Sequence, residues 1–157
     1  MVRTCVIVFG PPCSGKTGAL LRLLQEQEDR HTPEHSPAAA RFVLLSIGDY
    51  IRASKTTEPP ERLAEQALEA ACARMPSDGV LVLDGVKRAS HIYATLAVLA
   101  RHGVQLSAAV ELSSSYRAGS RGRPDDAVIG MRQKRYDADQ SLLISALQAS
   151  TKVPAHL

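Results

Sequence analysis

The feature that most constrains the fold is an apolar run that ends in a glycine-rich turn and continues into a helix. Residues 2–9 (VRTCVIVF) are rich in β-branched side chains and have the length of a buried strand. The segment GPPCSGKT (10–17) follows at once, and apolar residues then recur at helical spacing through residues 16–28. A strand, a tight turn and a helix in this order predict the first half of a βαβ unit.

The rest of the chain repeats this alternation. Further strands are expected at 41–46, 80–84 and 104–112. Helices are expected at 59–75, across 92–103 where Gly103 ends the pattern, and over most of the chain after 113. In the first of these helices the apolar face is expected to hold Leu63, Ala67, Ala70 and Ala71. The pattern predicts a three-layer α/β fold, with a parallel sheet of four to five strands and helices on both faces.

Composition limits the kind of protein. A length of 157 residues suits a single domain. With 4% aromatic residues and no Trp, stacking platforms for single-stranded nucleic acid are not expected. A net charge of +3 is too small to indicate nucleic-acid binding without a localised patch, and basic residues concentrate only between Arg117 and Arg135. Three cysteines (Cys5, Cys13 and Cys72) lack metal-ligand spacing and suit a reducing compartment. The first apolar run is too short to span a membrane. We expect a monomer of the cytoplasm, or of the nucleus, with no membrane or nucleic-acid partner.

The segment GPPCSGKT has the form of a phosphate-binding loop, because it follows a strand and opens a helix. Gly10 and Gly15 let successive backbone N–H groups face an anion, and the helix N-terminus adds partial positive charge. Lys16 is expected to reach the β- and γ-phosphates of ATP, and Thr17 to bind Mg²⁺ together with Asp84. The predicted ATP-binding residues of the loop are Gly10, Pro11, Pro12, Cys13, Ser14, Gly15, Lys16, Thr17 and Gly18.

Two arginines are expected near this loop. Arg52 lies in LSIGDYIRAS (45–54), after one predicted strand, and Arg88 lies in LDGVKR (83–88), after the next. The carboxyl ends of neighbouring parallel strands meet at one edge, so both side chains should face one cleft. Two arginines suit a phosphate acceptor, because they screen repulsion between two anions. A hydroxyl acceptor would instead need a carboxylate base, such as Asp49 or Asp84, and that alternative stays open.

The four motifs GPPCSGKT, SIGDYIRA, LDGVKR and RGRPDD, followed by an arginine and Tyr136, make the chain similar to the adenylate kinase or nucleoside monophosphate kinase family. The resemblance covers roughly residues 2–144. It implies transfer of the γ-phosphoryl group of ATP–Mg²⁺ to a nucleoside monophosphate, giving ADP and a nucleoside diphosphate.

The resemblance also implies roles for individual residues. Lys16, Arg88, Arg123 and Arg132 would be catalytic, with Lys134 or Arg135 as alternatives to Arg132. A minimal lid at about 115–126 would bring Arg117 and Arg123 onto the phosphates, with Asp125 and Asp126 orienting these arginines. The monophosphate would be bound by Ile47, Gly48, Asp49, Arg52, Gly85, Arg88 and His91.

The chain departs from the family at several positions. Ile47 replaces the threonine with which adenylate kinases contact the base, and His91 lies where the family tends to carry Gln or Asn. The preferred base is therefore left open. The monophosphate-binding segment, about 46–76 between the core segments 1–45 and 77–157, is short, and the C-terminus is shorter than in the family.

Three other functions are compatible with parts of the sequence. One is a phosphate-loop kinase with a hydroxyl acceptor, and another is a nucleotide-binding module without turnover. The third is DNA binding through RGRP (121–124), which inserts into the minor groove in some proteins. Asp125 and Asp126 follow that segment and would repel the DNA phosphates. The sequence therefore favours a role for these arginines in binding the phosphates of a nucleotide.

Overall fold

The computed structural model describes residues 2–10, 22, 25, 41–86, 88–111 and 129–151. The elements in chain order are β1 (Arg3–Phe9), β2 (Phe42–Ser46), α2 (Ile47–Ala53), α3 (Pro60–Arg74), β3 (Val80–Asp84), α4 (Ala89–Arg101), β4 (Val104–Glu111) and α5 (Ile129–Thr151). The helix predicted at 16–28 is described only at Arg22 and Gln25, which are both helical.

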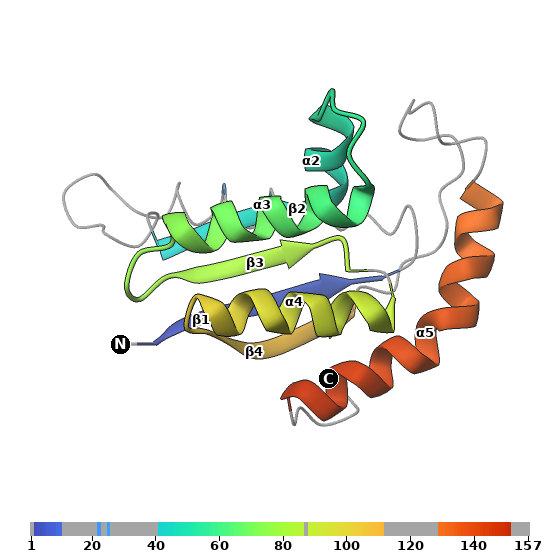
Figure 1. Ribbon diagram of the computed structural model, residues 1–157. Helices are drawn as coiled ribbons and strands as arrows, with labels where there is room; N and C mark the ends of the chain where they lie inside the picture. The colour runs from blue at the N-terminus through green and yellow to red at the C-terminus, as the bar shows by residue number, and fades with distance from the viewer. Residues whose placement is uncertain are drawn as a thin grey trace.

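The four strands of the described residues form a parallel sheet in the order β2-β3-β1-β4 (Figure 1). The central strands β1 and β3 are the most buried, and Cys5, Ile7, Leu81 and Leu83 are completely buried there. The register between β1 and β4 shifts after Cys5, where the Ser107 hydroxyl donates a hydrogen bond to the Cys5 carbonyl at 3.1 Å. This α/β architecture, consistent with a three-layer phosphate-loop fold, confirms the predicted fold class.

Helices α3 and α4 lie side by side along the sheet (Figure 1). Pro60 is the first residue of α3, a position where the missing N–H costs nothing. The predicted face of α3 is correct at Leu63, Ala67 and Ala71 but wrong at Ala70, which is exposed. Leu68 and Cys72 are buried instead, because α3 packs against α4 as well as against the sheet. The buried face is therefore rotated toward α4.

The helix predicted across 92–103 is α4, and its Ile92, Thr95, Val98 and Leu99 are buried. Gly103 adopts a φ of +63° just beyond the helix, the left-handed conformation that ends helices at glycine. The predicted C-terminal helical region contains α5, which contacts β4 and α4. None of the described helices is long and apolar enough to cross a membrane.

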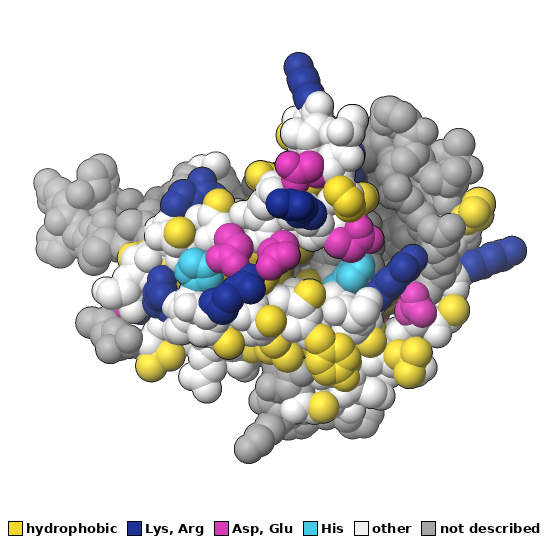
Figure 2. Space-filling view, in the orientation of Figure 1, with side chains coloured by type: hydrophobic (Ala, Val, Ile, Leu, Met, Phe, Trp, Pro, Cys, Tyr) yellow, Lys and Arg dark blue, Asp and Glu magenta, His cyan; other side chains and the backbone are white. Residues whose placement is uncertain are grey.

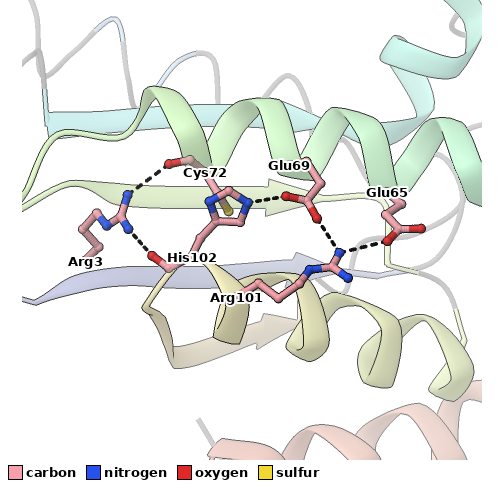
Figure 3. A network of polar contacts seen from close by, with 6 residues as sticks. All are labelled: Arg3, Glu65, Glu69, Cys72, Arg101 and His102. Carbon is pink, nitrogen blue, oxygen red and sulfur yellow. Dashed lines mark hydrogen bonds and ion pairs between the residues drawn. The ribbon is translucent and has the colours of Figure 1, made fainter.

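A network of polar contacts joins α3 to α4 and to the start of β1 (Figure 3). Arg3 donates hydrogen bonds to the backbone carbonyls of Cys72, at 3.1 Å, and His102. The His102 ring contacts the Glu69 carboxylate, and Arg101 pairs with both Glu69 and Glu65. In the space-filling view, side chains of both charges gather over these two helices (Figure 2). The network fixes the α3–α4 pair at the amino-terminal end of the sheet.

The opposite, carboxyl-terminal edge of the sheet carries α2 and the beginning of α4 (Figure 1). The middle of α5 is hydrogen-bonded there to Glu111, the last residue of β4. The sequence pattern predicts no helix at 47–53, whereas the structure has the seven-residue helix α2 there. None of its residues is buried, so it has no apolar face that a periodic pattern could reveal. All the described candidate site residues lie at or just beyond this edge.

Candidate active site

The ends of three strands meet at one place on the carboxyl edge. Asp84, the last residue of β3, pairs with Ser46 of β2 on one side and with Val8 of β1 on the other. The candidate loop residue Gly10 follows β1, while α2 begins directly after Ser46. The parallel register therefore brings together three segments that are far apart in the sequence.

The turn after β3 packs tightly against the first turn of α2. Gly85 has a φ of +116°, and a Cβ at this position would lie 2.9 Å from the Cβ of Ile47. It would also lie 3.5 Å from the backbone nitrogen of Gly48. Only glycine tolerates both this backbone conformation and this approach. The predicted acceptor residues Ile47, Gly48 and Gly85 are thus in direct proximity.

Arg52 turns back along its own helix. Its guanidinium pairs with Asp49, and a Cβ at Gly48 would lie 3.3 Å from one of its terminal nitrogens. The Arg52 and Asp49 side chains are 41% and 47% exposed, so solvent screens the pair. Pairs of this kind contribute about 0–1 kcal/mol, so an entering anion can displace the carboxylate at little cost.

Asp84 is buried, with 5% of its surface exposed, and its Oδ1 atom is shielded from solvent. A carboxylate oxygen is the ligand type that Mg²⁺ prefers, and this one lies beside the segment that carries Gly10. The donor type therefore fits the predicted metal role. The second predicted ligand, Thr17, lies outside the described residues.

Arg88 is the N-cap residue of α4, and its carbonyl accepts a backbone hydrogen bond from His91 at 3.0 Å. Its side chain is 55% exposed, and its Nε lies 3.9 Å from Oδ2 of Asp139 in α5. Since β2 and β3 are neighbours, α2 with Arg52 and the turn with Arg88 follow adjacent strands at the same edge. That both side chains face one cleft stays a prediction.

Helix α5 is attached to this edge through the last residue of β4. The Tyr136 hydroxyl donates a hydrogen bond to Oε1 of Glu111 at 2.8 Å, and Nε2 of Gln140 donates to the same oxygen at 2.7 Å. Burial, and then the hydrogen bond to Glu111, raise the pKa of Tyr136 above its ordinary value. The phenol therefore acts as a donor at neutral pH.

Sequence reasoning did not identify Glu111, Asp139 or Gln140 as parts of the edge. Glu111 carried a usable signal, because a charged residue that ends an apolar strand marks the carboxyl edge of a parallel sheet. Asp139 and Gln140 carried none, because their positions depend on how α5 is rotated against β4.

Several predicted site residues lie outside the description. The loop residues Pro11, Pro12, Cys13, Ser14, Gly15, Lys16, Thr17 and Gly18 and the lid residues Arg117, Arg123, Asp125 and Asp126 are outside the described ranges. Arg132 and Arg135 belong to α5, but their side chains are not described, whereas Lys134 is exposed.

Comparison of the sequence with known protein families and with curated proteins finds no match. Among solved structures, the chain is similar to one chain of the "Structure of the Pnkp1/Rnl/Hen1 RNA repair complex". The TM-score is 0.57 at 11% sequence identity, and the match covers 90% of this chain and 46% of that one. The present chain therefore spans about half the length of this neighbour. At this identity the likeness supports a shared fold.

Proposed function

We propose that the protein is a nucleoside monophosphate kinase, which transfers the γ-phosphoryl group of ATP to the phosphate of a nucleoside monophosphate. The observation that carries the proposal is the placement of Arg52 and Arg88. They belong to the segments that follow two adjacent parallel strands, at the edge that also holds Gly10 and the buried Asp84. Two exposed arginines at the edge where the predicted phosphate loop begins, at Gly10, suit an acceptor that is itself an anion.

In this proposal the two arginines bind the acceptor phosphate and offset its repulsion from the phosphates of ATP. The attacking oxygen is already ionised, so the reaction needs alignment and charge neutralisation rather than a general base. Lys16 would contact the transferring phosphate, and Asp84 with Thr17 would hold Mg²⁺. The metal would supply positive charge on the phosphates of ATP. The lid arginines Arg117 and Arg123 would complete the site.

The geometry gives less support to a hydroxyl acceptor. Of the two carboxylates considered as bases, Asp84 is buried at the end of β3, and Asp49 would first have to leave its weak pair with Arg52. A general base must reach the proton that it removes from the acceptor. Because the structural neighbour belongs to an RNA repair complex, an RNA oligonucleotide with a free hydroxyl end is the appropriate competing acceptor.

Replacing Arg88 by Ala tests the assignment of the acceptor site. The variant should raise the KM for the monophosphate roughly 30-fold or more, because a lost charge-assisted contact costs about 2–4 kcal/mol. The KM for ATP should change little. Steady-state kinetics with each substrate varied in turn separates the two effects.

Arg41→Ala is the matched control. Arg41 precedes β2 at the amino-terminal end of the sheet and pairs with Asp78 at 3.1 Å. Loss of this arginine should leave both KM values unchanged. If Arg88→Ala leaves the KM for the monophosphate unchanged, Arg88 does not bind the acceptor.

A further inference from the structure

We propose that Asp139 of α5 is a positioning residue that orients Arg88 toward the acceptor phosphate. The proposal rests on the function proposed above and adds to it a residue from a different part of the fold. Asp139 lies 51 positions after Arg88 in the chain, yet its carboxylate faces the guanidinium across the α4–α5 contact.

The contact uses one particular edge of the guanidinium. Oδ2 of Asp139 lies 3.9 Å from Nε of Arg88, so the carboxylate approaches the inner edge of the group. A guanidinium offers five N–H donors in a planar fork, four of them on the two terminal nitrogens. A carboxylate that attracts the Nε edge leaves the terminal nitrogens directed outward, where they can bind two phosphate oxygens at once.

Helix α5 holds Asp139 in a fixed place. Tyr136, one turn earlier, is 9% exposed and donates its hydroxyl to Glu111. Gln140, the next residue, donates to the same carboxylate, and Leu143 is completely buried one turn later. The backbone around Asp139 is thus attached to β4 and the core. The packing of α5 therefore fixes the backbone that carries Asp139 independently of the pairing with Arg88.

The Arg88–Asp139 pair should affect the orientation of Arg88 without affecting the stability of the fold. The Arg88 and Asp139 side chains are 55% and 38% exposed, and an ion pair that is so accessible to water contributes little to folding. A long arginine side chain, however, loses rotamer freedom when it binds a ligand. A carboxylate that orients the side chain in advance reduces this loss. The structure therefore predicts an effect on acceptor binding without a matching effect on stability.

The test is a double-mutant cycle with steady-state kinetics. Asp139→Ala and Asp139→Asn should raise the KM for the monophosphate roughly 3–10-fold, the cost of leaving one long side chain unoriented. The KM for ATP and the thermal midpoint should not change. Asp139→Glu, which keeps the charge, should restore most of the affinity. In an Arg88→Ala background, Asp139→Ala should have no further effect, because the group that it positions is absent.

Asp137→Asn is the matched control. It removes the same charge from the same helix, two positions away and therefore on the opposite side of the helix, and should leave the KM unchanged. An unchanged KM in Asp139→Ala, or an equal effect with and without Arg88, overturns the positioning role while turnover by the wild-type protein still supports the kinase. Failure of the wild-type protein to use any monophosphate overturns both proposals.

Discussion

Gly85 combines a positive φ, which only glycine adopts easily, with a close contact to α2. Its φ of +116° disfavours any residue with a side chain, and an added Cβ would collide with Ile47. Gly85→Ala should therefore lower the free energy of unfolding by about 1–3 kcal/mol. The loss should exceed that caused by the positive φ alone, because the added Cβ also collides with Ile47. Denaturant-induced unfolding, followed by circular dichroism, measures the difference.

Gly103→Ala is the control for that measurement. Gly103 also has a positive φ, but the nearest atom to an added Cβ is a terminal nitrogen of Arg3 at 4.0 Å. Its cost is that of the left-handed conformation, about 1–2 kcal/mol. If Gly85→Ala lowers the free energy of unfolding by no more than Gly103→Ala does, the Gly85 turn does not pack against α2 in this way.

The buried thiol of Cys5 should make the stability of the fold depend on pH. Burial, together with the nearby Cys72, raises the pKa of Cys5 from 9.0 to about 12. The folded state keeps this proton where the unfolded chain loses it. The contribution is present in full below about pH 9 and falls by about 1.4 kcal/mol per pH unit from there toward pH 12. Cys5→Ala should show a flatter decline in unfolding free energy over that range, and an identical slope would contradict the assignment.

The placement of candidate site residues at the carboxyl edge was predictable where they follow strand ends. Arg52 lies in the segment that follows one strand-like run, and Arg88 lies four residues after the next, so parallel topology places both segments at one edge. The partner of Arg88 was not predictable, because Asp139 reaches it only through the rotation of α5. That rotation depends on Tyr136 and Gln140 meeting Glu111, a contact that no local pattern encodes.

At the level of elements, Glu69 connects α3 to α4 by contacting both His102 and Arg101 (Figure 3). The hydrogen bond from His102 is the main reason that the pKa of Glu69 lies below its ordinary value. A lowered pKa means that the contribution to stability is present at neutral pH and is lost as the pH falls through the lowered value. Glu69→Gln should thus be less stable than the wild type at pH 7.

Thermal unfolding of both proteins from pH 7 to pH 3 measures this difference, which should shrink as Glu69 becomes protonated. Glu61, an exposed acid in the first turn of the same helix, provides the control variant Glu61→Gln. A gap between wild type and Glu69→Gln that stays constant with pH would contradict a role for the ionised carboxylate.

Elements with a strong apolar pattern were predicted well, and those without one were not. β3 and α3 were found because runs such as VLVLD and the Leu63–Ala67–Ala71 spacing reflect burial. α2 was missed because it buries no residue, and it is held by the Gly85 turn and by contacts with α3. The error at Ala70 has a related cause, since a helix that packs on two partners has a rotated buried face.

At the scale of the whole molecule, stabilising polar contacts and the candidate site lie at opposite ends of the sheet. The network of Arg3, Glu65, Glu69, Arg101 and His102 stabilises one end, whereas the candidate site occupies the other. Substitutions such as Glu69→Gln should therefore change stability and leave the KM values of the reaction unchanged. This separation follows from parallel topology, in which every described strand points its carboxyl end toward the same edge.

The most direct test of the proposed kinase activity is a coupled assay of ADP formation with ATP and Mg²⁺. The acceptors are AMP, CMP, UMP, GMP and dTMP, compared with a small hydroxyl acceptor and an RNA oligonucleotide. We expect ADP to form with at least one nucleoside monophosphate, and Lys16→Ala to abolish it. No turnover with any monophosphate, or turnover only with a hydroxyl acceptor, would contradict the proposal that the protein is a nucleoside monophosphate kinase.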